Sequence, residues 1–156
     1  MELFSIRPME ESDLDVVMYL EGVCFLAPWN LEQIRYELNE SPVSNVWVIE
    51  SSTSGVVGFV DCWIMFNFAT IAQICVNPVY RRRGLGRMML DEVIKDCKAH
   101  KMNNISLEVR THNEAAIKMY LESGFVINHT KKAYYTNGDD AYYMIKYLRD
   151  DEKGER

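Results

Sequence analysis

The sequence predicts an α/β fold in which a mixed sheet of about seven strands is flanked by about four helices. The first observation is the order of the periodic segments: a strand, two helices, three strands, a helix, a strand, a helix and two strands. The second is the spacing between them, because helical crossovers join parallel strands and short turns join antiparallel ones. The third is a basic, glycine-containing loop placed between a strand and a helix.

Each element follows from its local pattern. Apolar runs and period-two alternation predict strands at residues 3–7, 45–50, 58–66, 68–76, 105–110, 125–130 and 141–148. Apolar spacing near 3.6 residues predicts helices at 12–24, 31–38, 85–97 and 114–122. Pro28 separates the first two helices, Asn30 with Gln33 forms a capping box, and Gly124 is the expected C-terminal cap of the last helix.

The chain has 156 residues, of which 48% are hydrophobic. This length and composition indicate one domain with a full core. We expect that domain over residues 1–149, followed by a charged tail at 150–156. The formal net charge of −6 argues against a nucleic-acid partner, because nucleic-acid binding requires a broad basic surface. An acidic protein better suits a cationic partner.

The cysteines and histidines predict neither disulfides nor a metal site. The four cysteines lie in apolar runs without a Cys-x-x-Cys pair, as expected of reduced core residues. The three histidines share no ligand spacing. No apolar run approaches the ~20 residues of a membrane span, and the start of the chain lacks the basic region of a signal peptide. We therefore expect a soluble, cytoplasmic protein with no membrane partner.

The segment 71–91 contains the strongest local signal. Ile71–Val76 is nearly all apolar and predicts a strand buried on both faces. A helical pattern begins at Leu85, and Arg81–Gly86 connects the two. Glycines at a helix N-terminus allow a ligand to approach free N–H groups, and with the helix dipole and the arginines they indicate an anion site. A tight turn with a solvated basic face is the alternative.

The identity of the anion is narrowed by spacing. A P-loop is excluded, because no Gly-x4-Gly-Lys-Ser/Thr run follows Gly84. A dinucleotide fingerprint needs glycine or alanine where Met89 stands, although Glu108 lies at about the distance of the ribose-binding acid. Dinucleotide binding therefore remains an alternative.

Further candidate residues come from the second half of the chain and from residues 25–30. Period-two alternation in 105–110 places Glu108 opposite the buried face of its strand. Asn113 and Tyr120 are two helical turns apart, about 10 Å along one helix face. The aromatic segment 25–30 is either a wall of a peptide-binding groove or a buried elbow, since aromatic residues serve both.

The pattern Arg81-x-x-Gly84-x-Gly86 resembles the pyrophosphate loop of the GNAT superfamily of acyl-CoA N-acyltransferases. The resemblance continues through Leu107–Arg110, Asn113–Tyr120 and Gly124-Phe125 and covers about Ile6 to Leu148. Arg81 stands where many members have glutamine. Within the superfamily, Pro28-Trp29 and the segment 134–141 resemble the protein N-terminal acetyltransferases of the bacterial RimI type and their archaeal relatives.

This resemblance implies transfer of an acetyl group from acetyl-CoA to the N-terminal α-amino group of a ribosomal protein or of nascent chains, directly within a ternary complex. It implies Glu108 as the general base and Tyr120 as the general acid. The implied cofactor-binding residues are Ile74, Cys75, Val76, Arg81, Arg82, Arg83, Gly84, Leu85, Gly86, Arg87, Asn113 and Tyr120. The implied groove residues are Phe25, Leu26, Pro28, Trp29, Tyr134 and Tyr135.

Other readings remain open at this stage. The acceptor could be a lysine side chain or a small amine, the chain could be a non-catalytic acyl-CoA sensor, and an acyl-cysteine route is an alternative to direct transfer. The preferred N-terminal residue and the oligomeric state are not fixed by the sequence.

Overall fold

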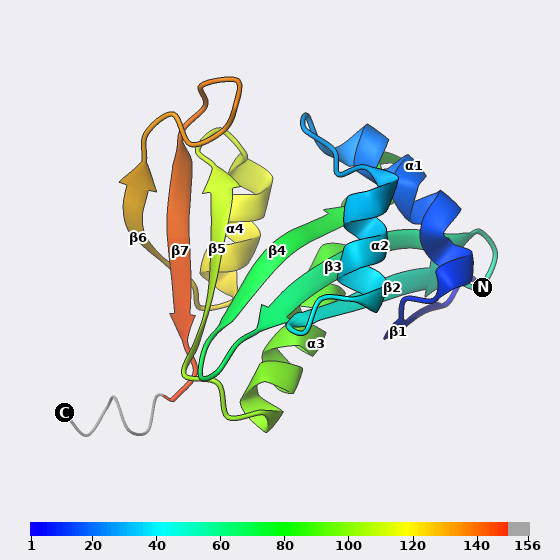
Figure 1. Cartoon of the computed structure of the whole chain (residues 1–156), viewed down its shortest axis with the longest axis horizontal. Coiled ribbons are helices and arrows are strands. Elements are labelled where there is room, and N and C mark those ends of the chain that lie inside the picture. Colours follow the sequence, from blue (N-terminus) through cyan, green and yellow to red (C-terminus); the bar gives the residue numbers. More distant parts are fainter. Residues whose placement is uncertain (150–156) are drawn as a thin grey trace. The chain divides into compact units, whose positions relative to one another are not determined.

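The computed structural model describes residues 1–149, and the tail expected at 150–156 lies outside them. Within the described residues, seven strands and four α-helices follow one another (Figure 1), which confirms the predicted fold class. Their bounds are β1 Phe4–Pro8, α1 Leu14–Cys24, α2 Leu31–Asn39, β2 Ser44–Ser51, β3 Gly55–Ile64, β4 Ala69–Val76, α3 Leu85–Ala99, β5 Asn104–Arg110, α4 Glu114–Glu122, β6 Val126–Lys131 and β7 Ala141–Tyr147.

The strands form one mixed sheet in the order β1-β2-β3-β4-β5-β7-β6. The β1/β2, β2/β3, β5/β7 and β7/β6 pairs are antiparallel. The β4/β5 pair is parallel, and its register joins Ala69 to Ile105 and Thr70 to Ser106. The α3 crossover between β4 and β5 explains this parallel pair, because a parallel connection requires a long segment between its strands.

Two compact units emerge from the contacts within the chain: residues 1–64 with 71–93, and residues 65–70 with the chain from Ile94 onward. The single domain expected from composition stays a prediction. In the described residues, no helix is both long and apolar enough to cross a membrane.

The first unit packs α1 and α2 on strands β2 and β3 (Figure 1). Its core contains buried apolar side chains from each of these elements, among them Val17, Leu20, Ile34, Val48 and Phe59. The start of α2 confirms the predicted capping box, because Asn30 Oδ1 accepts a bond from the Gln33 N–H and Gln33 Oε1 accepts one from the Asn30 N–H.

The second unit contains the antiparallel ladder β5-β7-β6 and helix α4. Ile105, Leu107 and Val109 are buried, whereas Glu108 and Arg110 remain partly exposed. The alternation predicted for β5 is thus confirmed except at Ser106, which is 4% exposed because its hydroxyl is buried against that of Thr70 at 3.0 Å. The predicted C-terminal cap of α4 is also confirmed, since Gly124 has φ +96° in the left-handed region.

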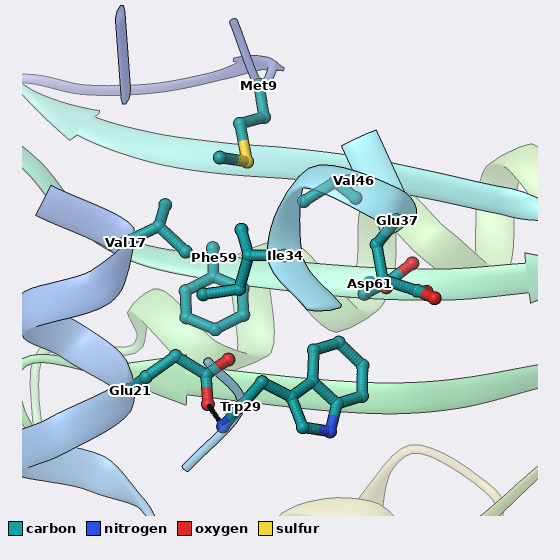
Figure 2. A pocket seen from close by; sticks show the side chains of 9 residues that line it. All are labelled: Met9, Val17, Glu21, Trp29, Ile34, Glu37, Val46, Phe59 and Asp61. Carbon is teal, nitrogen blue, oxygen red and sulfur yellow. Dashed lines mark hydrogen bonds between the residues drawn. The ribbon is translucent and has the colours of Figure 1, made fainter. Parts of the chain in front are cut away.

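An acidic cavity lies in the core of the first unit (Figure 2). Three carboxyl groups line it together with apolar side chains: Met9, Val17, Glu21, Trp29, Ile34, Glu37, Val46, Phe59 and Asp61. Asp61 is only 1% exposed, and burial together with a hydrogen bond to Glu37 raises its pKa to about 8. Asp61 therefore holds a proton at neutral pH.

The hydrogen-bond partners of this acidic pair come from strands β3 and β2. Trp63 Nε1 donates to Glu37 Oε1 at 2.6 Å, and Ser44 Oγ donates to Asp61 Oδ1 at 2.6 Å. Hydrogen bonds to a carboxyl group favour its charged form, whereas burial opposes it. Here burial and the neighbouring Glu37 charge outweigh the serine bond, so the Asp61 proton is retained.

Replacing Asp61 with asparagine should change the pH dependence of stability. An unfolded aspartate titrates near pH 3.9. Between about pH 4 and 8 the folded chain therefore binds a proton at Asp61 that the unfolded chain lacks. The free energy of unfolding consequently falls as the pH rises through this range. Asp61→Asn supplies an amide donor to Glu37 without this proton. We expect the free energy of unfolding at pH 8 to rise by about 1–3 kcal/mol, and the gain to vanish towards pH 4.

Denaturant unfolding at pH 5 and pH 8 measures this difference. Asp91→Asn, at an exposed position on α3, is the matched control and should leave the parent slope with pH unchanged. Parallel slopes for the parent and Asp61→Asn would show that Asp61 carries no native-state proton.

Candidate active site

The loop between α1 and α2 combines the two roles considered for residues 25–30. The Phe25 ring lies 6.4 Å from the Phe59 ring, and Trp29 lines the acidic cavity. Leu26 and Pro28 are exposed. The loop is therefore anchored through two aromatic side chains, and it presents Leu26 and Pro28 to the surface.

Glu21 fixes this loop to strand β4. Its Oε1 accepts a bond of 2.9 Å from the Trp29 N–H, which Figure 2 shows, and one of 3.2 Å from Gln73 Nε2 on β4. Burial raises the pKa of Glu21, which is 1% exposed. The sequence analysis missed this residue, although its position one turn after Val17 on the apolar face of α1 was a usable signal.

Strand β4 leads into the predicted anion site. Ile71, Gln73 and Cys75 are buried, but Ala72, Ile74 and Val76 remain partly exposed, so the expectation of burial on both faces is wrong for the second face. The strand lies very close to β3, because a Cβ added to Gly58 would meet the Cys75 carbonyl oxygen at 2.7 Å. Only glycine permits this approach.

The basic loop adopts the geometry that an anion site requires. Gly84 has φ +79° and Arg82 has φ +66°, so the chain turns sharply before α3 begins at Leu85. The Met88 N–H donates to the Gly84 carbonyl at 3.0 Å. The preceding N–H groups belong to the first turn, where a helix offers no internal acceptor.

Two of the three clustered arginines, Arg81 and Arg83, make contacts with other residues of the first unit. Arg81 Nε donates to the Val76 carbonyl at 3.3 Å. Arg83 pairs with Glu2 at 3.1 Å, and its guanidinium lies 4.7 Å from the centroid of the Tyr80 ring. Arg82 is exposed. The backbone thus carries more of the predicted anion site than the arginine side chains do.

Cys24, the last residue of α1, lies beside the C-terminal end of β4 and has an unusual environment. Its Sγ is 3.6 Å from the Val76 carbonyl oxygen. A hydrogen bond from the Cys75 thiol, together with the Arg81 charge, lowers the pKa of Cys24 to about 7, while burial raises the pKa of Cys75. This thiol was not singled out from the sequence, because the groups that lower its pKa, Cys75 and Arg81, lie far from it along the chain.

In the second unit, the predicted base is ion-paired. Lys131 Nζ lies 2.7 Å from Glu108 Oε2. The same ammonium group is 5.0 Å from the centroid of the Tyr143 ring and 5.3 Å from that of Tyr134. Tyr143 is the β7 partner of Glu108. The sequence analysis missed Lys131, because the contact joins strands that are not neighbours in the sheet.

The loop between β6 and β7 is braced by Arg110. The guanidinium of Arg110 donates to Asp139 Oδ2 at 2.7 Å and to Asn137 Oδ1 at 3.0 Å. It also lies 3.8 Å from the centroid of the Tyr135 ring, and the Tyr134 and Tyr135 rings meet edge to face at 5.0 Å. The predicted groove residues of this unit are thus held beside the strand that carries Glu108.

Tyr120 lies buried in the second unit. It is 5% exposed and packs on Phe125 with a centroid distance of 5.7 Å. Burial, with the nearby Tyr135 as a second cause, raises its pKa above the ordinary value, so the phenol stays protonated. Asn113 caps α4, because its Oδ1 accepts a bond from the Ala116 N–H at 3.3 Å.

The site residues predicted from the sequence therefore form two groups. The first unit contains the loop 25–30, the end of β4 and the basic loop, and the second contains Glu108, Asn113, Tyr120, Tyr134 and Tyr135. Within each unit the predicted residues lie near one another. Their roles stay predictions.

Comparison with known proteins shows the family and the fold of the chain. The model of the Acetyltransferase (GNAT) family matches residues 14–125. The ribosomal protein bS18-alanine N-acetyltransferase of Salmonella typhimurium (strain LT2) is 35% identical over 143 residues, which cover 90% of this chain and 95% of that protein.

Solved structures give the same result. The ribosomal-protein-S18-alanine N-acetyltransferase from Escherichia coli superposes with a TM-score of 0.85 at 26% identity, covering 94% of both chains. Ard1 from Thermoplasma volcanium superposes with a TM-score of 0.85 at 28% identity, covering 93% of this chain and 97% of that chain. The fold and the matched relatives are those of N-acetyltransferases. The family match covers more than half of the chain, and the chain therefore belongs to the Acetyltransferase (GNAT) family.

Cys24 should react first with a thiol reagent. The thiolate is the nucleophilic form, Cys24 is partly exposed, and Cys62, Cys75 and Cys97 are buried. We expect the rate of alkylation of Cys24 by iodoacetamide to rise with pH through a midpoint of about 7, measured by peptide mapping over time. Cys24→Ser should leave the folded protein nearly unreactive. A midpoint near 8.5, the value of an ordinary cysteine, would contradict the thiol environment described above.

Proposed function

We propose that this protein transfers the acetyl group of acetyl-CoA to the N-terminal α-amino group of a protein. The observation that carries the proposal is the acid–base pair of the second unit. Glu108 is a partly exposed carboxylate, and Tyr120 is a phenol that burial keeps protonated. Burial raises the pKa of Tyr134 and Tyr135, and the charge of Glu108 adds to this rise, so both tyrosines lie within its electrostatic reach.

The first unit would bind the cofactor. Backbone groups of Ile74, Cys75 and Val76 would hold the pantetheine arm as an added strand is held at a sheet edge. Amides of residues 82–87 would bind the pyrophosphate, where the left-handed turn and the first turn of α3 present N–H groups. The family resemblance adds Asn113 to the residues proposed to contact the cofactor.

The reaction then proceeds by direct transfer. Glu108 accepts a proton from the substrate ammonium, directly or through water, and the neutral amine attacks the thioester carbonyl carbon. The C–S bond breaks as Tyr120 protonates the departing sulfur, and the second proton of the amine nitrogen then passes to the Tyr120 phenolate, which restores the phenol. An α-amine has a pKa of about 7.7–8.0, against about 10.4 for lysine, so less basicity is demanded of Glu108 at an N-terminus.

The relatives favour a particular acceptor. Two of the matched proteins, from Salmonella typhimurium and Escherichia coli, are named for the alanine N-terminus of ribosomal protein S18. A protein that begins with alanine, including a ribosomal protein, is therefore the first substrate to test. The residues proposed to contact its first residues are Tyr134 and Tyr135 in one unit and the exposed part of the loop 25–30 in the other.

The decisive experiment offers acetyl-CoA with peptides that begin with Ala, Ser or Met and contain an internal lysine, each with a free or a blocked α-amine. We expect CoA release and a mass increase at the α-amine of the free peptides alone. Acetylation of the blocked peptides would place the reaction on lysine. Tight acetyl-CoA binding without turnover on any amine would indicate a sensor.

Loss of either proposed proton-transfer group should slow the chemical step. We expect Glu108→Gln and Tyr120→Phe each to lower kcat by about 10²-fold or more, the scale of acid–base assistance, while the affinity for acetyl-CoA is retained. Steady-state kinetics and calorimetry give these two quantities. Glu122→Gln on α4 and Tyr19→Phe on α1, both at exposed positions, are controls. Parent rates for both site variants would remove Glu108 and Tyr120 from the chemistry.

A further inference from the structure

The ammonium group of Lys131 occupies a defined position in the second unit, between Glu108 and two tyrosine rings. Strand β7 lies between β5 and β6 (Figure 1), so the Lys131 side chain reaches from the end of β6 across β7 to Glu108 on β5. It passes over Tyr143, whose ring centroid is 5.0 Å from Nζ, and ends 2.7 Å from Glu108 Oε2. Tyr134 contributes a second ring at 5.3 Å.

The groups around this position, Glu108, Tyr134 and Tyr143, suit a primary ammonium group. A carboxylate supplies a charge-assisted hydrogen bond, and two aromatic rings supply cation–π attraction. Before it loses its proton, the acceptor of an N-acetyltransferase is also a primary ammonium. It must come within hydrogen-bond reach of the general base, which is the position that Lys131 already holds. This step rests on the proposed role of Glu108.

We propose that Lys131 is an internal occupant of the acceptor-amine position, and that the substrate N-terminus displaces it when it binds. Lys131 is then a positioning residue that controls the affinity for the acceptor. It neutralises the Glu108 charge in the empty enzyme, and it excludes amines that do not gain enough from the groove to compete.

The environment of Lys131 permits displacement. Its side chain is 34% exposed, and a lysine ammonium on a flexible four-carbon stem can turn into solvent. The hydrogen bond to Glu108 raises the pKa of Lys131, so the occupant stays charged at neutral pH. Partly exposed ion pairs contribute little free energy, and the substrate therefore has a small barrier to overcome.

Removing the occupant should strengthen substrate binding. Lys131→Met keeps an unbranched apolar stem and deletes the ammonium. We expect the KM for an alanine-initiated peptide to fall about fivefold, the ratio that a weak ion pair supports. We expect kcat at saturating peptide to stay within about twofold of the parent value and the KM for acetyl-CoA to be unchanged.

Two further variants separate occupancy from a structural role. Lys131→Arg retains the charge and should restore a KM close to that of the parent. Lys132→Met removes the neighbouring lysine, which is 81% exposed and pairs with Asp140 at 3.2 Å, and should have no effect. A fall in kcat with unchanged KM for Lys131→Met would overturn the proposal and show instead that Lys131 orients Glu108.

Peptide binding measured by calorimetry on the CoA-bound protein makes the test independent of turnover. We expect Lys131→Met to lower the peptide Kd about fivefold. An unchanged Kd with an active parent enzyme would refute the occupancy alone. Absence of turnover in the parent and every variant would refute the proposed function, whatever the value of Kd.

Discussion

The chemistry proposed for the second unit depends on the register of the ladder β5-β7-β6. Side chains alternate between the two faces of a strand, so a slip of one residue would exchange all of them. Ile105, Leu107 and Val109 are buried, and their burial makes this register the stable one. Glu108 consequently faces the side that carries Tyr143 and Lys131, and the apolar residues of β5 determine where its carboxylate lies.

In the first unit, the buried carboxyl group of Glu21 fixes the position of the loop 25–30. Glu21 has few alternatives to its bonds with the Trp29 N–H and with Gln73, because an unpaired carboxyl group in a core is costly. Its two bonds join the loop 25–30 to the strand that is proposed to hold the cofactor. The Asp61–Glu37 pair lies in the same cavity, so the desolvation of polar groups offsets part of the packing energy of this core.

The sequence predicted the local features well. The period of β5 located Glu108, the glycine spacing located the sharp turn before α3, and Asn30 with Gln33 located the start of α2, because each signal arises within a few residues. Cys24 with Val76, Glu21 with Gln73 and Lys131 with Glu108 lie 52, 52 and 23 residues apart. Such contacts depend on strand order and packing, which no local period reports. The partly exposed face of β4 was missed for the same reason.

Gly58 shows how far the geometry of the site extends beyond its functional groups. This position carries no side chain, yet it sets the distance between β3 and the Cys75 carbonyl. Even a methyl group there would push β4 away from its neighbour, and the carbonyls proposed to hold the cofactor would move with the strand. Gly58 is neither an acid, a base nor a nucleophile, yet the spacing of β3 and β4 is determined there by the absence of an atom.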